Sequence, residues 1–203
     1  KIGLEEIRTS NHQVQVDGGT IEVREYSSEN IGEFASSMVY FHGGGWVIGD
    51  TDTHDNVCRY ICKKLNMKIF SVNYRLSPEY KFPIPFNDCF EAYEWISNHA
   101  ELLEVDPEMI SVGGDSAGGN LATSICIERK KKGKPLPNAQ LLIYPATDLR
   151  LVTNSMITDC NEGYVLTEEL MTWFVDHYLD SDQLKNDPRV SPLLAEKLDG
   201  LPP

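Results

Sequence analysis

The 203-residue sequence lacks several features that would place it in common classes of protein. It has no run of 18 apolar residues, so no membrane-spanning helix is predicted. It has no Cys-x-x-Cys pair, so the usual zinc and thioredoxin-like patterns are absent. Neither glycine pattern of the nucleotide-phosphate loops, G-x-x-x-x-G-K-[ST] or G-x-G-x-x-G, occurs. We therefore expect no metal and no cofactor.

Basic residues are also scarce: 18 Lys and Arg stand against 31 Asp and Glu, which gives a net charge of −13. Such a charge disfavours nucleic acid and anionic membrane surfaces as partners and fits a neutral small-molecule substrate better. The five cysteines follow no pairing pattern, so we expect buried thiols in a reducing cytoplasm. A hydrophobic content of 41 % and this length predict one globular domain over residues 1–203.

The most informative segment that is present is Gly114–Gly118, which has the pattern Gly-x-Ser-x-Gly. It follows an apolar run at 110–113 that is typical of a strand, and it leads into a stretch at 119–126 that is typical of a helix. A serine between a strand and a helix sits on a strained turn with its hydroxyl pushed out of the sheet. Side chains at Gly114 or Gly118 would crowd that turn. The pattern predicts Ser116 as a nucleophile.

A second glycine-rich segment, His42-Gly43-Gly44-Gly45-Trp46, follows a short apolar strand at 38–41. Acyl transfer places negative charge on a carbonyl oxygen, and backbone N–H groups must already point at that oxygen. A triple-glycine turn lets bare backbone approach a substrate closely. We predict an oxyanion hole formed by the amides of Gly44, Gly45 and Ala117. His42 and Gly43 are expected to shape the loop, and Trp46 to line the substrate pocket.

These motifs, in this order, resemble the hormone-sensitive-lipase-like esterases, bacterial family IV of the α/β-hydrolases. The resemblance covers the chain from about residue 20 to its end. It rests on His42–Trp46, Asn73–Glu79 with Phe82-Pro83, Gly114–Ala122, Tyr144-Pro145, Glu162–Tyr164 and Asp187–Leu193.

The resemblance implies an α/β-hydrolase fold, with a mostly parallel sheet, helices on both faces and the last strands missing. Residues 150–195 are similar to the helical cap of the family and are expected to form such an insertion. The catalytic acid and histidine of the family follow a Gly-Leu-Pro-Pro segment such as 200–203, so both are expected beyond Pro203. His177, the one histidine after Ser116, lies on an amphipathic helical stretch and is interpreted as a solvated residue. Asp115 is interpreted as structural, because the acid of this fold comes later in the chain.

The resemblance further implies a carboxylic ester hydrolase that acts on small-molecule esters. Two alternatives remain: an amide deacetylase on the same scaffold, and a small-molecule-binding relative that has lost catalysis. Tyr74, Arg75 and Glu79 are expected to brace the loop over the site rather than to take part in the chemistry.

Strands and helices alternate along the chain, which predicts crossover units and a mostly parallel sheet. An exposed edge at 141–144 would invite pairing with another chain, so we predict aggregation or a homo-oligomer formed through that edge. We expect strands at 21–26, 38–41, 68–74, 110–113 and 140–144, and helices at 56–65, 87–99 and 117–132.

Overall fold

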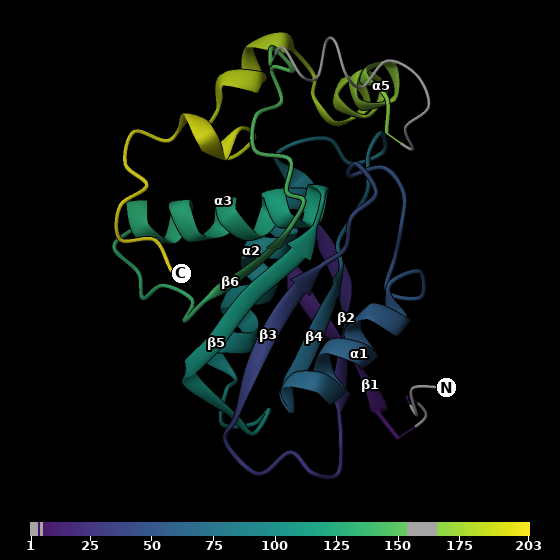
Figure 1. Ribbon diagram of the computed structural model, residues 1–203, viewed down its shortest axis with the longest axis vertical. Helices are drawn as coiled ribbons and strands as arrows, with labels where there is room; N and C mark the ends of the chain where they lie inside the picture. The colour runs from purple at the N-terminus through teal and green to yellow at the C-terminus, as the bar shows by residue number, and fades with distance from the viewer. Residues whose placement is uncertain (1–3, 5, 154–165) are drawn as a thin grey trace.

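The computed structural model describes residue 4, residues 6–153 and residues 166–203, and these form a six-stranded sheet with helices against it (Figure 1). The order of strands across the sheet is β1-β2-β4-β3-β5-β6. The first two strands form an antiparallel hairpin, β2 pairs antiparallel with β4, and the last four strands run parallel. The strands are β1 (Arg8–Val16), β2 (Gly19–Ser27), β3 (Ala35–Phe41), β4 (Lys68–Asn73), β5 (Val105–Asp115) and β6 (Gln140–Ile143).

The parallel strands are joined by helical crossovers, as a sheet of this kind requires. Short 3-10 helices at Asp182–Asn186 and Pro192–Leu194 follow the last α-helix. The α-helices are α1 (Asp55–Leu65), α2 (Ile84–Asn98), α3 (Ala117–Lys131) and α5 (Glu168–Tyr178).

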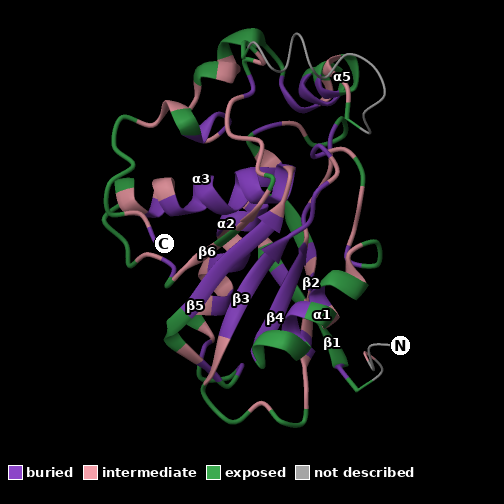
Figure 2. Cartoon of the chain, viewed as in Figure 1, coloured by how far each residue is buried: buried purple, intermediate pink, exposed green. Residues whose placement is uncertain are grey.

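The two faces of the sheet are covered by different helices. Along β3, Val39 and Phe41 pack into the cluster that contains the apolar residues of α2 and α3. Met38 and Tyr40, which alternate with them, pack into a smaller cluster with α1. Alternate residues of a strand point to opposite faces, so β3 is buried on both sides, and Figure 2 shows the central strands as the buried part of the molecule. The mostly parallel α/β architecture predicted from the sequence is therefore confirmed.

The expected elements are all present, with differences at their ends. Helix α2 begins at Ile84 rather than 87, because a proline is tolerated in the first turn of a helix and Pro85 lies there. Strand β5 begins at Val105 rather than 110, and its pairing with β3 is irregular where it passes Pro107. Strand β1 was not predicted, because it is mostly polar and only Val14 of its nine residues is buried.

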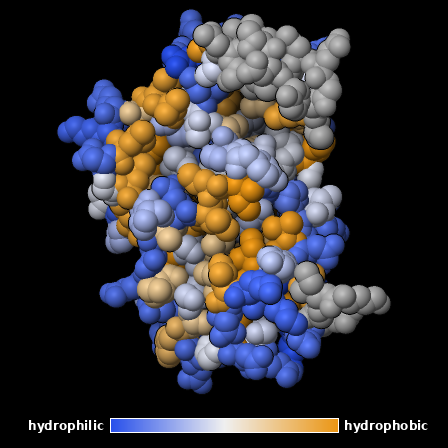
Figure 3. All heavy atoms as spheres, in the orientation of Figure 1, coloured by the Kyte–Doolittle hydropathy of each residue, from blue (hydrophilic) through white to orange (hydrophobic). Residues whose placement is uncertain are grey.

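Strand β6 lies at one edge of the sheet, as predicted. The backbone N–H of Gln140 donates to the carbonyl of Pro203 at 2.8 Å, and its side-chain amide donates to the carbonyl of Pro202 at 2.8 Å. Further along, Leu141 is 36 % and Tyr144 74 % exposed. In the orientation of Figure 1, hydrophobic residues gather near the middle of the visible face of the molecule (Figure 3). Association through this edge stays a prediction.

The region expected to form a cap, residues 150–195, is partly described. It contains α5 and the two 3-10 helices, and Met171 and Val175 of α5 join the main core cluster. Residues 154–165 of this region, including 162–164 of the family motif, lie outside the described residues. The division into one domain with a cap insertion stays a prediction.

The thiols behave as expected within the described part of the chain. Cys58, Cys62, Cys89 and Cys126 are free and buried, while Cys160 lies outside it. Desolvation raises the pKa of Cys126 to about 12, which keeps that thiol protonated and unreactive.

Candidate active site

Ser116 occupies a strained turn between β5 and α3. Its φ of 52° and ψ of −115° lie in a region that residues with a side chain rarely adopt. A Cβ at Gly114 would lie 2.4 Å from the carbonyl oxygen of Phe41, and a Cβ at Gly118 would lie 1.8 Å from the same atom. Both glycines are therefore required for the turn to press against the end of β3, as the Gly-x-Ser-x-Gly pattern predicted.

Backbone hydrogen bonds hold the serine turn in place. The N–H of Ser116 donates to the carbonyl of Ile143 at 2.9 Å, and the N–H of Ala146 donates to the carbonyl of Ser116 at 3.2 Å. Asn120, one turn into α3, donates its side-chain amide to the carbonyls of Ala146 (2.6 Å) and Val190 (2.8 Å). The turn is thus fixed to β6 and to the segment that follows α5.

The glycine loop follows β3, which pairs with β5 so that Phe41 stands beside Gly114. Gly44 has a φ of +113°, and a Cβ there would lie 2.0 Å from the carbonyl oxygen of Ile48. The carbonyl of Gly44 accepts the N–H groups of Val47 (3.1 Å) and Ile48 (3.0 Å), which closes the loop on itself. We call residues 42–49 the oxyanion loop. The predicted donors, the amides of Gly44, Gly45 and Ala117, have no protein acceptor among the described residues.

His42 is buried at the base of this loop. Its Nδ1 donates to the carbonyl of Gly43 at 2.7 Å, and its ring stacks on Tyr74 with centroids 4.3 Å apart. Desolvation lowers the pKa of His42 to about 4, so the ring is neutral at neutral pH. These contacts place His42 against the loop, and its role in shaping the loop stays a prediction.

The segment after β4 braces the loop from the side. The hydroxyl of Tyr74 donates to the carbonyl of His42 at 2.7 Å, and the N–H of Ser77 donates to the carbonyl of Trp46 at 2.8 Å. Arg75 fixes this segment to α2 through a bidentate ion pair with Asp88, whose side chain is fully buried. The predicted bracing is confirmed for Tyr74 and Arg75, whereas Glu79 is exposed.

Helix α5 packs directly on the oxyanion loop. Trp46 has no exposed surface and stacks on Tyr178 with centroids 4.5 Å apart. A Cβ at Gly45 would lie 2.3 Å from the ring of Phe174. The prediction that Trp46 lines a substrate pocket is therefore not supported, because packing against α5 leaves its side chain no surface that a substrate can reach.

Asp115 joins the serine turn to the oxyanion loop. Its Oδ1 accepts the hydroxyl of Tyr40 at 2.8 Å and the N–H of Gly43 at 3.0 Å, and its carboxylate also faces Nε2 of His54. These hydrogen bonds are those of a structural residue, and the structural role of Asp115 stays a prediction. The part played by His54 was missed, because the two residues lie 61 positions apart and no local pattern links them.

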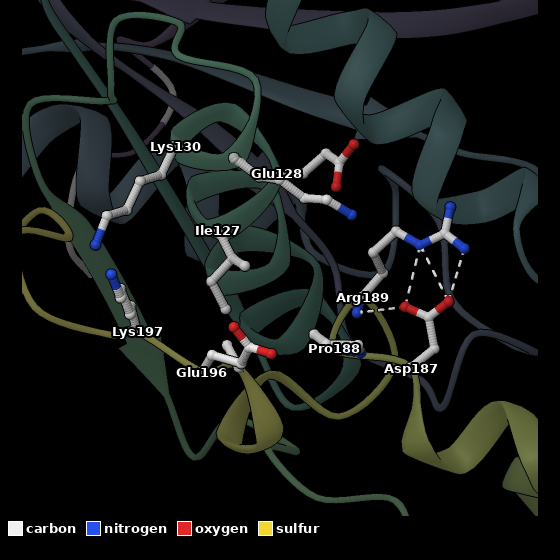
Figure 4. Close-up of a pocket in the computed structure, with 10 residues that line it drawn as sticks. Ile127, Glu128, Lys130, Asp187, Pro188, Arg189, Glu196 and Lys197 are labelled. Carbon is white, nitrogen blue, oxygen red and sulfur yellow. Dashed lines mark hydrogen bonds and ion pairs between the residues drawn. The ribbon is translucent and has the colours of Figure 1, made fainter.

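His177 lies on α5 with its Nδ1 bonded to the carbonyl of Trp173 at 2.8 Å. No described side chain hydrogen-bonds the hydroxyl of Ser116, and the described residues contain no cluster suited to a metal ion. A cavity of about 780 Å³ lies elsewhere, between α3 and the segment 187–197 (Figure 4). It is lined largely by charged side chains, including the paired Asp187 and Arg189, and no serine, threonine or cysteine is among its described lining residues, so we do not assign it as the active site.

Comparison of the chain with known proteins identifies the family to which it belongs. Residues 38–203 match the model of a protein family that is described as having the alpha/beta hydrolase fold. The chain belongs to this family. The match confirms the fold class and the resemblance to hormone-sensitive-lipase-like esterases that the motifs indicated.

The relatives are named as ester hydrolases. The carboxylic ester hydrolase LipN of Mycobacterium tuberculosis is 43 % identical over 191 residues, which are 91 % of this chain and 50 % of that protein. The ethyl acetate hydrolase of Pseudomonas putida is 34 % identical over 88 % of this chain and 57 % of its own length. The crystal structure of the thermostable carboxylesterase EstE1, cloned from a metagenomic library, has a TM-score of 0.92 at 40 % identity and matches 97 % of this chain and 67 % of that one.

The chain therefore spans about half the length of the curated relatives it matches. Among the described residues, no helix is both long and apolar enough to cross a bilayer.

Proposed function

We propose that the protein is a carboxylic ester hydrolase in which Ser116 is the acylated nucleophile. The observation that carries this proposal is the strained turn at Ser116, which Asp115 links to Gly43 of the oxyanion loop, together with the amides of Gly44, Gly45 and Ala117, which have no protein acceptor within the described residues. The names of the relatives point to the same reaction.

In this mechanism the Ser116 hydroxyl attacks the ester carbonyl and loses its proton to a general base. The amides of Gly44, Gly45 and Ala117 receive the negative charge that forms on the carbonyl oxygen. Each such donor is worth roughly 10²- to 10³-fold in kcat in hydrolases where one has been removed. The alcohol then leaves, and water releases the acid from the serine. The family pattern places the base and its acid partner after the segment 200–203, so we assign neither role to a described residue.

The substrate we propose is an uncharged ester of a small carboxylic acid. The name of the ethyl acetate hydrolase points to small esters, and a net charge of −13 repels anionic substrates at a distance. The finer choice of acyl group and alcohol is left to experiment.

The test uses protein made from the complete gene, assayed with p-nitrophenyl butyrate and with the corresponding anilide. Ser116→Ala should abolish hydrolysis and also the labelling of the protein by a fluorophosphonate. Ser124→Ala is the matched control. Ser124 lies on α3, which begins directly after Ser116, and its buried hydroxyl has no hydrogen-bond partner among the described residues, so activity should persist. Cleavage of the anilide in preference to the ester would point to the amide deacetylase. Ligand binding without labelling of Ser116 would point to the binding relative.

A further inference from the structure

The side chain of Asp115 connects the nucleophile turn to Gly43, the first glycine of the oxyanion loop. Its Oδ1 accepts the Gly43 N–H at 3.0 Å, and a Cβ at Gly43 would lie 2.2 Å from Oδ2. The carboxylate therefore lies flat against the Gly43 backbone. Because Asp115 immediately precedes Ser116, a shift of this carboxylate moves the loop relative to the nucleophile.

His54 holds the same carboxylate from the other side. Its Nε2 lies 3.3 Å from Oδ1 and 3.4 Å from Oδ2 of Asp115. The His54 side chain is 18 % exposed and that of Asp115 is 14 % exposed, so the pair is largely screened from water. His54 stands at the N-terminal end of α1, yet its side chain makes no capping hydrogen bond to that helix. Its contacts are directed to the active site instead.

The contacts around Thr53 bear on the protonation of His54. The Thr53 hydroxyl lies 2.8 Å from the carbonyl of Asp50, and its oxygen accepts the N–H of Asp50 at 2.9 Å. The same hydroxyl lies 3.0 Å from Nδ1 of His54. When its one proton is given to the Asp50 carbonyl, Nδ1 is the donor in that contact, and Nε2 donates to the carboxylate, which only accepts. In this arrangement both ring nitrogens of His54 carry a proton.

We propose that His54, as an imidazolium, is a positioning residue that fixes Asp115 against Gly43 and thereby holds the oxyanion loop in its catalytic shape. The inference rests on the proposed function, because it concerns the loop that would stabilise the ester transition state. His54 does not touch the reacting atoms and acts only through Asp115.

The groups that face His54 agree with this charge state. They are the carboxylates of Asp115 and Asp50, the neutral ring of His42 with its centroid 5.5 Å away, and the phenol of Tyr40 with its centroid 6.4 Å away. The hydrogen bond to Asp115 raises the pKa of His54 although burial opposes it. Burial alone would raise the pKa of Asp115, but hydrogen bonds from His54 and Tyr40 outweigh it and hold that pKa below its usual value.

The pH dependence follows from these directions. The pKa of His54 is raised in the folded protein. The ionic contact with Asp115 is therefore fully present below about pH 6.5, the pKa of a histidine in the unfolded chain, and it is lost as the pH rises through the pKa of His54 in the folded protein. A lowered Asp115 pKa means that the contact is lost in acid as pH falls through the folded value. Loosening of the loop through His54 therefore belongs to the alkaline side.

The chain offers a matched control pair. His12 and Glu25 also form a half-buried histidine–carboxylate contact, with Nε2 2.9 Å from Oε2 and exposures of 24 % and 12 %. This pair bridges β1 and β2 and makes no contact with the oxyanion loop. His12→Gln therefore measures the general effect of removing such a pair.

The first experiment is NMR on the complete protein and does not depend on activity. We expect both ring nitrogens of His54 to be protonated at pH 7, and the amide proton of Gly43 to shift with the titration of His54. The Gly43 shift should lose this titration in His54→Gln and keep it in His12→Gln. A neutral His54 ring at pH 7, or a Gly43 amide that ignores the state of His54, would overturn the inference.

The second experiment is kinetics between pH 6 and pH 10. His54→Ala should lower kcat about tenfold or more with little change in KM, a smaller loss than deletion of an oxyanion donor itself. His54→Gln keeps a donor but has no charge to lose, so it should lose less activity and should not show the alkaline fall of the wild type. Equal losses in the His54 and His12 variants, or an alkaline fall that survives in His54→Gln, would contradict the catalytic part. Absence of any Ser116-dependent hydrolysis in the wild type would instead refute the proposed function, and the NMR result would still decide whether His54 fixes the loop.

Discussion

Substitution of Gly45 by alanine tests whether α5 sets the shape of the oxyanion loop. The backbone of Gly45 has a φ of +59°, and a new Cβ would lie 2.3 Å from Cγ and Cδ1 of the Phe174 ring, which is 8 % exposed. The positive φ costs a residue with a side chain about 1–2 kcal/mol. Forcing a methyl group into a packed core adds about 1–3 kcal/mol. We therefore expect Gly45→Ala to lower the free energy of unfolding by about 2–5 kcal/mol.

Gly133 supplies the control that separates these two costs. Its φ of +64° matches that of Gly45, but a Cβ there would meet nothing within 4 Å. Gly133→Ala should therefore show only the backbone cost of about 1–2 kcal/mol. The effect of alanine on the unfolded chain is the same at both positions and cancels in the comparison.

Urea unfolding of the complete protein, followed by tryptophan fluorescence, measures both variants, and the rate of fluorophosphonate labelling reports on Ser116. In a Phe174→Ala background, Gly45→Ala should cost no more than Gly133→Ala, because the Cγ and Cδ atoms that obstruct the methyl group are gone. Equal costs for the two glycines in the wild-type background, or no relief from Phe174→Ala, would refute the assigned contact.

Two further predictions use matched pairs. Tyr74→Phe should cost about 1 kcal/mol, because it removes the 2.7 Å hydrogen bond to the His42 carbonyl. Tyr178→Phe should leave stability unchanged or raised, because that buried hydroxyl has no partner within the described part of the chain. Equal destabilisation by the two substitutions in thermal melts would count against these assignments. Arg75→Ala should cost about 3–5 kcal/mol, because it leaves the fully buried Asp88 carboxylate without its ion-pair partner. Arg8→Ala breaks a pair with Glu29 whose side chains are 74 % and 71 % exposed, so it should cause no measurable change. A small effect at Arg75 in urea unfolding would contradict the assigned burial.

The sequence predicted the turns and strands that a short local pattern, such as a glycine motif or an apolar run, is enough to indicate. The glycines on either side of Ser116 and the triple glycine after His42 predicted two turns. In both turns a Cβ at the motif glycines would collide with neighbouring atoms, which are backbone at Gly44, Gly114 and Gly118 and side chains at Gly43 and Gly45. Strand β3 was predicted from its apolar residues, because burial on both faces leaves an uninterrupted hydrophobic run.

What the sequence did not predict depends on contacts between distant residues. Trp46 stands next to the oxyanion glycines and invited a pocket role, but its environment is set by Tyr178, 132 residues later. His54 stands at the start of a helix, where a polar residue needs no special explanation, and its partner lies on another strand. Strand β1 pairs only with β2 and has one buried residue, so hydrogen bonding rather than a hydrophobic pattern defines it.

The oxyanion loop is held from three directions, and this arrangement follows from the strand order. Strands β4, β3 and β5 are parallel neighbours, so their carboxyl ends meet at one edge of the sheet, where α/β folds place their ligands. Tyr74 reaches the loop from the end of β4 and Asp115 from the end of β5, while α5 presses on it through Phe174. A glycine-rich loop has little rigidity of its own. Its amides are therefore preorganised for an oxyanion only to the extent that all three supports are in place, so α5 positions the proposed catalytic donors as well as packing beside them.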